Sequence, residues 1–178
     1  MQTLAAGGFT LVELMITIAV AAILLAVAVP SFRTITLSSR LSTASNDVVA
    51  AFNTARLEAI KLNAHTQLCS DSASTNTSDT LGSACGTQAG AVYAMNGTSA
   101  ALVRTASLNV TSPLKFNGGM AALRFNGQGM ATAAGSTAPM SGVIADICTS
   151  DLSSGNHRIV TVTTGYSIQT QTTTGDCP

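Results

Sequence analysis

The stretch Gly8-Phe9-Thr10-Leu11-Val12-Glu13 opens an apolar run, Leu14–Val29, which ends just before Pro30. The run holds sixteen residues without a charge, and at about 1.5 Å per helical residue it would cover roughly 24 Å. The hydrocarbon core of a membrane, roughly 30 Å thick, is spanned only if the helix reaches from Thr10 to Phe32, which places Glu13 inside. A carboxylate there costs roughly 2.5–3.5 kcal/mol, so Glu13 is predicted to serve a function and to need a partner.

Two ordinary explanations of this segment leave its pattern unexplained. Ala26-Val27-Ala28 offers the A-x-A cleavage site of a secretory signal peptide, which would make the chain a secreted protein. The second explanation is a simple signal anchor. Neither accounts for a glycine followed at the fifth position by an acid, with the apolar run beginning only after that acid.

The stretch Gly8-Phe9-Thr10-Leu11-Val12-Glu13-Leu14, followed by the apolar helix and Pro30, resembles the class III signal of type IV pilins and type II secretion pseudopilins. The resemblance implies that residues 1–8 are a leader peptide, removed after Gly8 by a prepilin peptidase that also N-methylates Phe9. It implies that Glu13 meets the N-terminal ammonium of a neighbouring subunit, which supplies the partner that the charge needs. Residues 9–32 would first cross the inner membrane and then lie in a filament core, where the helix can kink or melt at Pro30.

Beyond the apolar run the helix is predicted to continue as an amphipathic one over residues 33–64. Its apolar residues recur at a mean spacing of roughly 3.6, the helical period. The stripe is narrow and rich in alanine, so we expect it to dock closely on a β-sheet rather than to form a free coiled coil. Asn63-Ala64 is expected to end the helix. The stripe comprises Leu37, Leu41, Ala44, Val48, Phe52, Ala55, Ala59 and Leu62.

From residue 65 to residue 178 the pattern changes to a period of two, which predicts a β-rich domain. Short strands with Gly- and Asn-containing turns favour two antiparallel sheets packed against the helix. The predicted fold class is α+β: a long N-terminal helix, transmembrane and then amphipathic, packed on a C-terminal antiparallel two-sheet β domain. Ser70–Gly90 is expected to be a polar loop and Gly118-Gly119 a turn. The expected strands are Thr66–Cys69, Ala91–Met95, Ala101–Ala106, Pro113–Phe116, Ala122–Phe125, Met130–Ala133, Val143–Cys148, Arg158–Val162 and Tyr166–Gln171.

The four cysteines are Cys69, Cys85, Cys148 and Cys177. An even count behind a membrane signal indicates two disulfides, and three pairings are possible. We favour Cys69–Cys85 with Cys148–Cys177, because each bond then closes a short loop within its own half of the domain. Four reduced thiols remain the alternative. A zinc site is disfavoured, because no Cys-x-x-Cys pair occurs.

Several later stretches resemble the minor pseudopilin GspH and the FimT/FimU minor pilins. That resemblance covers nearly the whole chain and implies a long helix on a two-sheet β domain held on the periplasmic side of the inner membrane. The implied partners are other minor and major pilins or pseudopilins, the prepilin peptidase, and an assembly platform in the inner membrane. The stretches that carry it are Ala55–Ile60, Thr66–Cys69, Leu123–Gly129, His157–Val160 and Gly175–Pro178.

Composition and motifs argue against a catalytic, metal or cofactor site. The formal net charge is zero and only 9% of residues are charged, so no large basic face can attract nucleic acid. His65 and His157 stand in no metal-ligand or nucleophile–base spacing. Asp146 and Asp151 are interpreted as residues of solvated loops, and no nucleotide-binding glycine motif occurs.

Some FimT-type subunits resemble DNA receptors, which carry a Gly-Arg-x-Arg pattern in their C-terminal region. The present chain reads Gly165-Tyr166-Ser167-Ile168 at the comparable turn, and phosphate contacts depend on Lys and Arg, which argues against DNA as a partner. The leading hypothesis is a structural minor pilin that takes part in type IV pilus assembly near the filament tip. The alternatives are a type II secretion minor pseudopilin H, a DNA-uptake receptor and a secreted enzyme.

Overall fold

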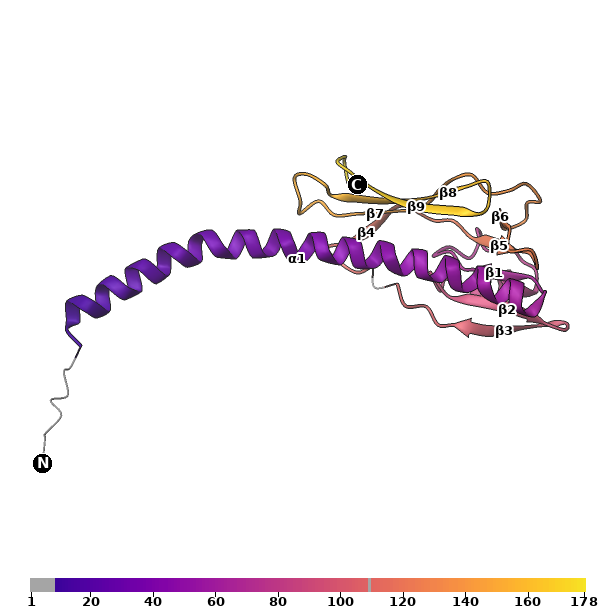
Figure 1. Cartoon of the computed structure of the whole chain (residues 1–178), viewed down its shortest axis with the longest axis horizontal. Helices are drawn as coiled ribbons and strands as arrows, with labels where there is room; N and C mark the ends of the chain where they lie inside the picture. The colour runs from indigo at the N-terminus through magenta and orange to yellow at the C-terminus, as the bar shows by residue number, and fades with distance from the viewer. Residues whose placement is uncertain (1–8, 109) are drawn as a thin grey trace, which may run out of the picture. The chain divides into compact units, whose positions relative to one another are not determined.

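The computed structural model describes residues 9–108 and 110–178, so the predicted leader, residues 1–8, lies outside the described residues. The chain divides into two units, one up to Leu37 and one from Ser38 to Pro178. The helix α1 (Leu11–Leu62) belongs to both units (Figure 1). It includes Pro30, and the kink expected there stays a prediction.

In the first unit, α1 exposes its apolar side chains. Every described side chain from Leu11 to Thr36 is exposed, including large ones such as Leu14, Ile18 and Leu24. An 18-residue window of this helix has a mean hydropathy of 2.7, and none of it is buried. By length and composition, this part of α1 can therefore cross a membrane.

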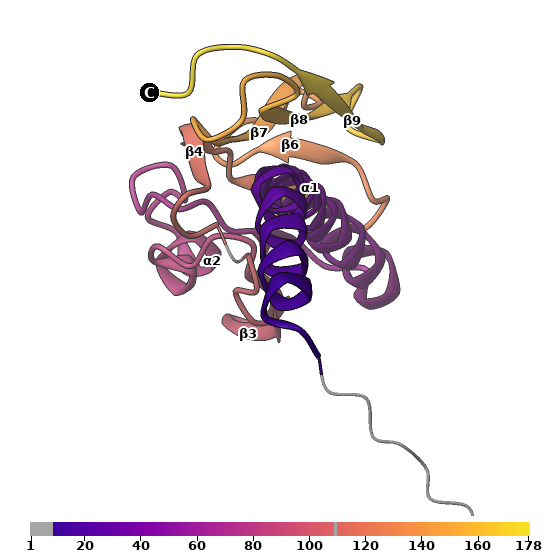
Figure 2. The same ribbon diagram turned by 90° about the vertical axis from the view of Figure 1, so that its left-hand side faces the viewer.

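The second unit combines the C-terminal part of α1 with two antiparallel sheets (Figure 2). One sheet has five strands in the order β3-β2-β1-β5-β6, and the other has four in the order β4-β7-β8-β9. This arrangement confirms the predicted α+β architecture of a long helix followed by two sheets. The strands are β1 (Thr66–Leu68), β2 (Val92–Asn96), β3 (Ser99–Arg104), β4 (Lys115–Met120), β5 (Leu123–Phe125), β6 (Ala131–Ala133), β7 (Gly142–Cys148), β8 (His157–Thr163) and β9 (Ser167–Thr173).

The core forms where one face of α1 meets the sheets. The rings of Phe52 on α1 and Phe125 on β5 meet edge to face with their centroids 5.0 Å apart, and both side chains are fully buried. Small residues on the same helix face let the backbone approach the strands closely, as the alanine-rich stripe predicted. Leu62, expected to belong to this stripe, is instead 48% exposed. The buried residues of the helix face are Leu41, Ala44, Ser45, Val48, Ala51, Phe52, Ala55 and Ala59.

The helix ends where the sequence predicted, because Asn63 adopts a left-handed conformation with φ 46°. The Asn63 N–H donates to Ile60 O and the Ala64 N–H donates to Ala59 O. These are the two hydrogen bonds of a Schellman motif, which satisfies helix-end carbonyls and redirects the chain. The chain therefore leaves α1 directly into β1.

Two local expectations were wrong. The segment Ser70–Gly90 contains a short helix, α2 (Thr80–Cys85), and is not only a polar loop. Gly118-Gly119 is not a turn between strands, because β4 runs through both glycines with positive φ values of 84° and 81°. The register of β4 against β7 shifts at this point, so the two glycines form an irregularity within the strand.

Candidate functional site

The first turn of α1 holds Glu13 in a hydrogen-bonded arrangement with Thr10. The Glu13 N–H donates to Thr10 Oγ1 at 3.2 Å, and the Thr10 N–H donates to Glu13 Oε2 at 3.4 Å. Thr10 precedes the first helical residue, Leu11, so the pair forms a capping box, in which two side chains satisfy two free N–H groups at the helix start. The Thr-x-x-Glu spacing of a capping box is present in the sequence, although Glu13 was predicted only to be a partner for another subunit.

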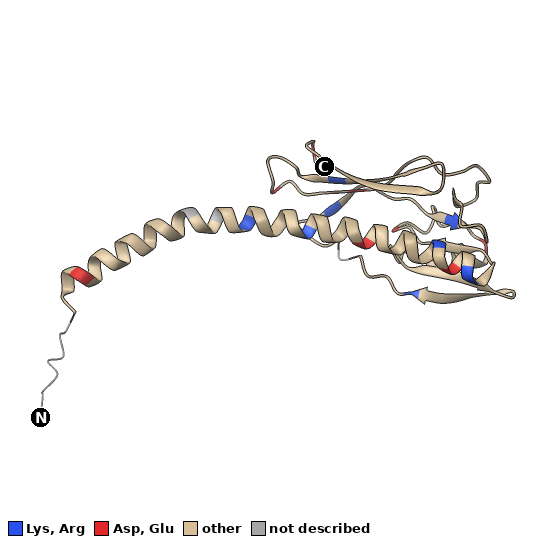
Figure 3. Ribbon diagram, viewed as in Figure 1, with Lys and Arg blue, Asp and Glu red and all other residues tan. Residues whose placement is uncertain are grey.

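The charge of Glu13 stands alone at this end of the helix. Between Glu13 and Arg33 the sequence has no charged residue, as Figure 3 shows along α1. Within the described residues no ion pair involves Glu13, and its carboxylate accepts a hydrogen bond from the Thr10 amide. A neutral amide satisfies part of the carboxylate's hydrogen bonding but leaves its charge uncompensated.

Phe9, the predicted new N-terminal residue, is 83% exposed next to this cap. Leu11 and Val12 follow it with exposed side chains. The site is therefore an apolar helix start with a single carboxylate. Such a surface is stable only when lipid or other apolar helices cover it.

At its other end, α1 is fixed to the β domain by two arginines. Arg158 on β8 donates to Ser38 Oγ at 3.1 Å and to Ser42 Oγ at 3.4 Å on α1. It also donates to the carbonyl of Gly155 at 2.7 Å. Burial lowers the pKa of this guanidinium, which is hydrogen-bonded to neutral acceptors. This contact could not be predicted from local sequence patterns, because the serines lie 116 or more residues away from Arg158.

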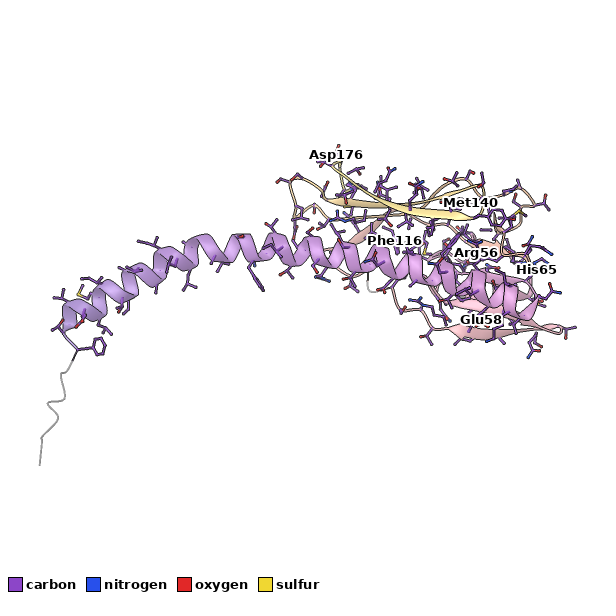
Figure 4. All side chains as sticks on the ribbon, viewed as in Figure 1. Arg56, Glu58, His65, Phe116, Met140 and Asp176 are labelled. Atoms are coloured by element: carbon purple, nitrogen blue, oxygen red, sulfur yellow. A yellow bond between two sulfur atoms is a disulfide. The ribbon has the colours of Figure 1, made fainter. Side chains whose placement is uncertain are left out.

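Arg56 on α1 fixes the helix to the turn between β8 and β9. Its Nη1 donates to Tyr166 O at 3.0 Å, and its guanidinium carbon lies 5.4 Å from the centre of the Tyr166 ring. Figure 4 labels Arg56 on the part of α1 that faces the β domain. The two arginines therefore fix the second half of the helix to the β domain.

Comparison with known proteins gives two matches to family models. Residues 44–165 match the family described as Type II transport protein GspH. Residues 4–29 match the Prokaryotic N-terminal methylation motif. The chain belongs to the GspH family. It is a minor pilin or pseudopilin, and this family consists of structural subunits. No curated protein and no solved structure matches the chain.

The GspH-family β domain contains two disulfides, in the pairing that the loop lengths favoured. Cys69 is bonded to Cys85 and Cys148 to Cys177. The first bond links Cys69, directly after β1, to Cys85 at the end of α2. The second ties the C-terminal tail to the end of β7. Each closes a loop within one part of the domain and restricts the unfolded chain.

The loop around α2 in this GspH-family chain is held by a polar network that sequence reasoning missed. Asn76 is fully buried and its amide contacts Ser70 and Gly86. Asp79 caps α2 through the Gly82 N–H at 2.9 Å and accepts from Arg124 Nη2 at 2.8 Å. Burial alone would raise the pKa of Asp79, but these hydrogen bonds and the Arg124 charge outweigh it and hold that pKa below its ordinary value.

Asp146 lies in β7 and not in a solvated loop, which corrects the interpretation from sequence. Its carboxylate accepts from His157 Nδ1 at 2.9 Å and from Asn117 Nδ2 at 2.9 Å. His157 is 4% exposed, and its Nε2 is buried without a hydrogen-bond partner among the described residues. No nucleophile therefore adjoins this pair, and the described residues contain no group of three or more metal-ligating side chains. Asp151 is exposed in the following turn, and His65 is exposed between α1 and β1.

Proposed function

We propose that this GspH-family chain is a FimT/FimU-like minor pilin that takes part in assembly or priming of a type IV pilus near the filament tip. The observation that carries the proposal is the first half of α1, which is predominantly apolar, has exposed side chains wherever they are described, and carries one carboxylate in its first turn. Such a helix is suited to two successive environments: the membrane before assembly and a bundle of similar helices afterwards.

The proposal assigns roles to the N-terminal residues. The prepilin peptidase cuts after Gly8 and methylates the new amine of Phe9, which keeps an ammonium at the helix start. Glu13 accepts the ammonium of a neighbouring subunit, which supplies the positive charge that the described chain does not. Pro30 provides a point where α1 can bend or lose hydrogen bonds inside the filament. Before assembly the chain sits in the inner membrane with its β domain in the periplasm.

A type II secretion minor pseudopilin is the second candidate, and the description of the matching family favours it. The two roles use the same helix and differ in the filament that the chain enters. In either role the chain supplies structure and no chemistry of its own.

Two of the basic residues that a DNA receptor would need are either paired within the chain or buried. Arg124 binds both carboxylate oxygens of Asp79, and Arg158 is only 7% exposed. Phosphate binding needs accessible Lys or Arg. This geometry supports the proposal that DNA is not a partner of the chain.

Deletion of the gene in its native host separates the two filament roles. We expect loss of most surface pili, restored by the wild-type gene on a plasmid, with unchanged amounts of exported enzymes in the medium. The measurement is a pilus count by electron microscopy beside an assay of exported proteins. Normal piliation with blocked export would replace the pilus role by the secretion role.

A further inference from the structure

The two sheets present four edges, and three of them are protected against pairing with another chain. β3 carries Arg104 and has an irregular register against β2. β4 begins with Lys115 and contains the Gly118-Gly119 irregularity. The free side of the three-residue β6 is covered, because the Met140 N–H donates to Ala131 O at 2.8 Å. Charges, bulges, short length and covering segments are the usual devices that prevent edge pairing.

The fourth edge, β9, has none of these devices. Its seven residues, Ser167–Thr173, include no charge, no proline and no glycine. Its pairing with β8 runs through seven residues without a register shift. In such a strand alternate backbone N–H and C=O groups point away from the sheet. Among the described residues, no backbone hydrogen bond outside the β8 pairing reaches β9.

The C-terminal tail does not cover this edge. After Thr173 the chain turns towards the other strands of the sheet, where Asn156 binds Gly175 through both its amide oxygen and its amide nitrogen. The disulfide from Cys177 to Cys148 then fixes the tail at β7, two strands away from β9. The tail is thereby held over β8 and β7, and β9 stays open.

The open edge runs along the second half of α1. The start of β8 contacts the helix at Ser38 through Arg158, and the turn after β8 contacts it at Arg56 through Tyr166. The helical stretch from residue 38 to 56 measures about 27 Å at 1.5 Å per residue. β8 from Arg158 to its end at Thr163 measures about 17 Å at 3.3 Å per residue, and each of the two helix contacts adds the length of an arginine side chain. Because the two ends of β8 contact helix positions that lie this far apart, β8 and its neighbour β9 run along the helix axis rather than across it (Figure 1).

We propose that the open edge of β9 binds an extended, uncharged segment of a neighbouring filament subunit by strand addition. The inference rests on the proposed function, because subunits whose helices pack side by side bring their β domains together laterally, where an edge parallel to the helix faces the neighbour. Backbone hydrogen bonds supply the affinity in such additions. The Ser, Thr and Gln side chains of β9 offer no charge to attract an acidic or basic segment.

Site-specific photocrosslinking in the native host tests this edge on the full-length chain. p-Benzoylphenylalanine replaces Gln171 on β9 in one strain and Ser154, exposed in the β7–β8 loop, in a control strain. We expect a cross-link only from position 171, to a peptide from another protein that carries a prepilin signal. The double variant Gln169→Lys with Gln171→Lys should remove the chain's copurification with that subunit, whereas Ser153→Lys with Ser154→Lys should not.

Sheared filaments are probed in parallel for the chain itself, which separates the two hypotheses. If the chain is in filaments but position 171 gives no cross-link, or links to a second copy or to an exported protein, the edge proposal is overturned and the filament role stands. If the chain is absent from filaments, the proposed function is wrong, and the edge proposal, which depends on it, is wrong as well.

Discussion

Glu13→Val is expected to lower incorporation of the chain into filaments on the order of tenfold, while membrane insertion and leader cleavage stay near wild-type levels. If Glu13 pairs with the ammonium of a neighbouring subunit as proposed, the substitution leaves that ammonium buried without a counter-charge, and removal of one partner from a buried pair is strongly unfavourable. Cleavage after Gly8, as proposed, is expected to be spared, because the substituted residue lies beyond that bond and the helix becomes more apolar. The measurement compares the chain in sheared filaments with the chain in membranes by immunoblot.

Glu13→Gln separates the charge from the capping box. Glutamine keeps an oxygen that accepts from the Thr10 N–H and suits the same capping position, but it carries no charge. If the charge recruits the subunit, Glu13→Gln loses incorporation as Glu13→Val does. Wild-type incorporation of Glu13→Gln together with loss in Glu13→Val would assign Glu13 to helix capping alone.

Phe52→Ala is expected to destabilise the β domain by about 3–5 kcal/mol, the range for removal of a buried aromatic ring. Phe52 is fully buried against Phe125, and this pair joins α1 to the central part of the five-stranded sheet. Thermal unfolding of the full-length chain in detergent measures the effect. Leu57→Ala provides the control, because Leu57 lies on the same helix and is 64% exposed.

The control variant should change the free energy of unfolding by no more than about 0.5 kcal/mol. Equal losses in the two variants would mean that the buried face of α1 does not contribute the packing described here. A loss in Phe52→Ala alone supports the docking of the alanine-rich stripe on the sheet.

The long helix and its end were predictable because their signals are local. The apolar run, the period of the stripe and Asn63 each lie within a few residues of the feature that they determine. The disulfide pairing was also predictable, because the loops that the two bonds close are short. The same local reasoning overestimated the burial of Leu62, which is 48% exposed although Ala59 in the same turn is fully buried.

The features that sequence reasoning missed depend on contacts between distant residues. α2 forms in a segment of small polar residues, and Asp79 is held there by Arg124 from β5, 45 residues away. Asp146 was interpreted as a solvated acid, although the predicted strand Val143–Cys148 contains it, because its partner His157 lies on the next strand. The Gly118-Gly119 pair was predicted to be a turn because glycine readily adopts positive φ, a conformation that an irregular strand also uses.

The N-terminal site likewise has one feature with a local sequence signal and one that depends on distant residues. The Thr10–Glu13 cap lies within one helical turn, and its spacing could have been read from the sequence. The proposed role of Glu13 towards another subunit depends on a second chain, and it rests on the resemblance of the N-terminal motif and on the uncompensated charge of Glu13. Gly8 and Phe9 owe their assignment to the motif that precedes the helix.

The N-terminus of the chain within assembled filaments tests the central claim most directly. Filaments are sheared from the native host, and the chain is analysed by intact mass and by sequencing of its N-terminal peptide. We predict a chain that begins with N-methylated Phe9 and retains the whole of α1. A chain found only in the medium or periplasm with its N-terminus near Val29 would contradict this account and establish an ordinary secretory signal peptide.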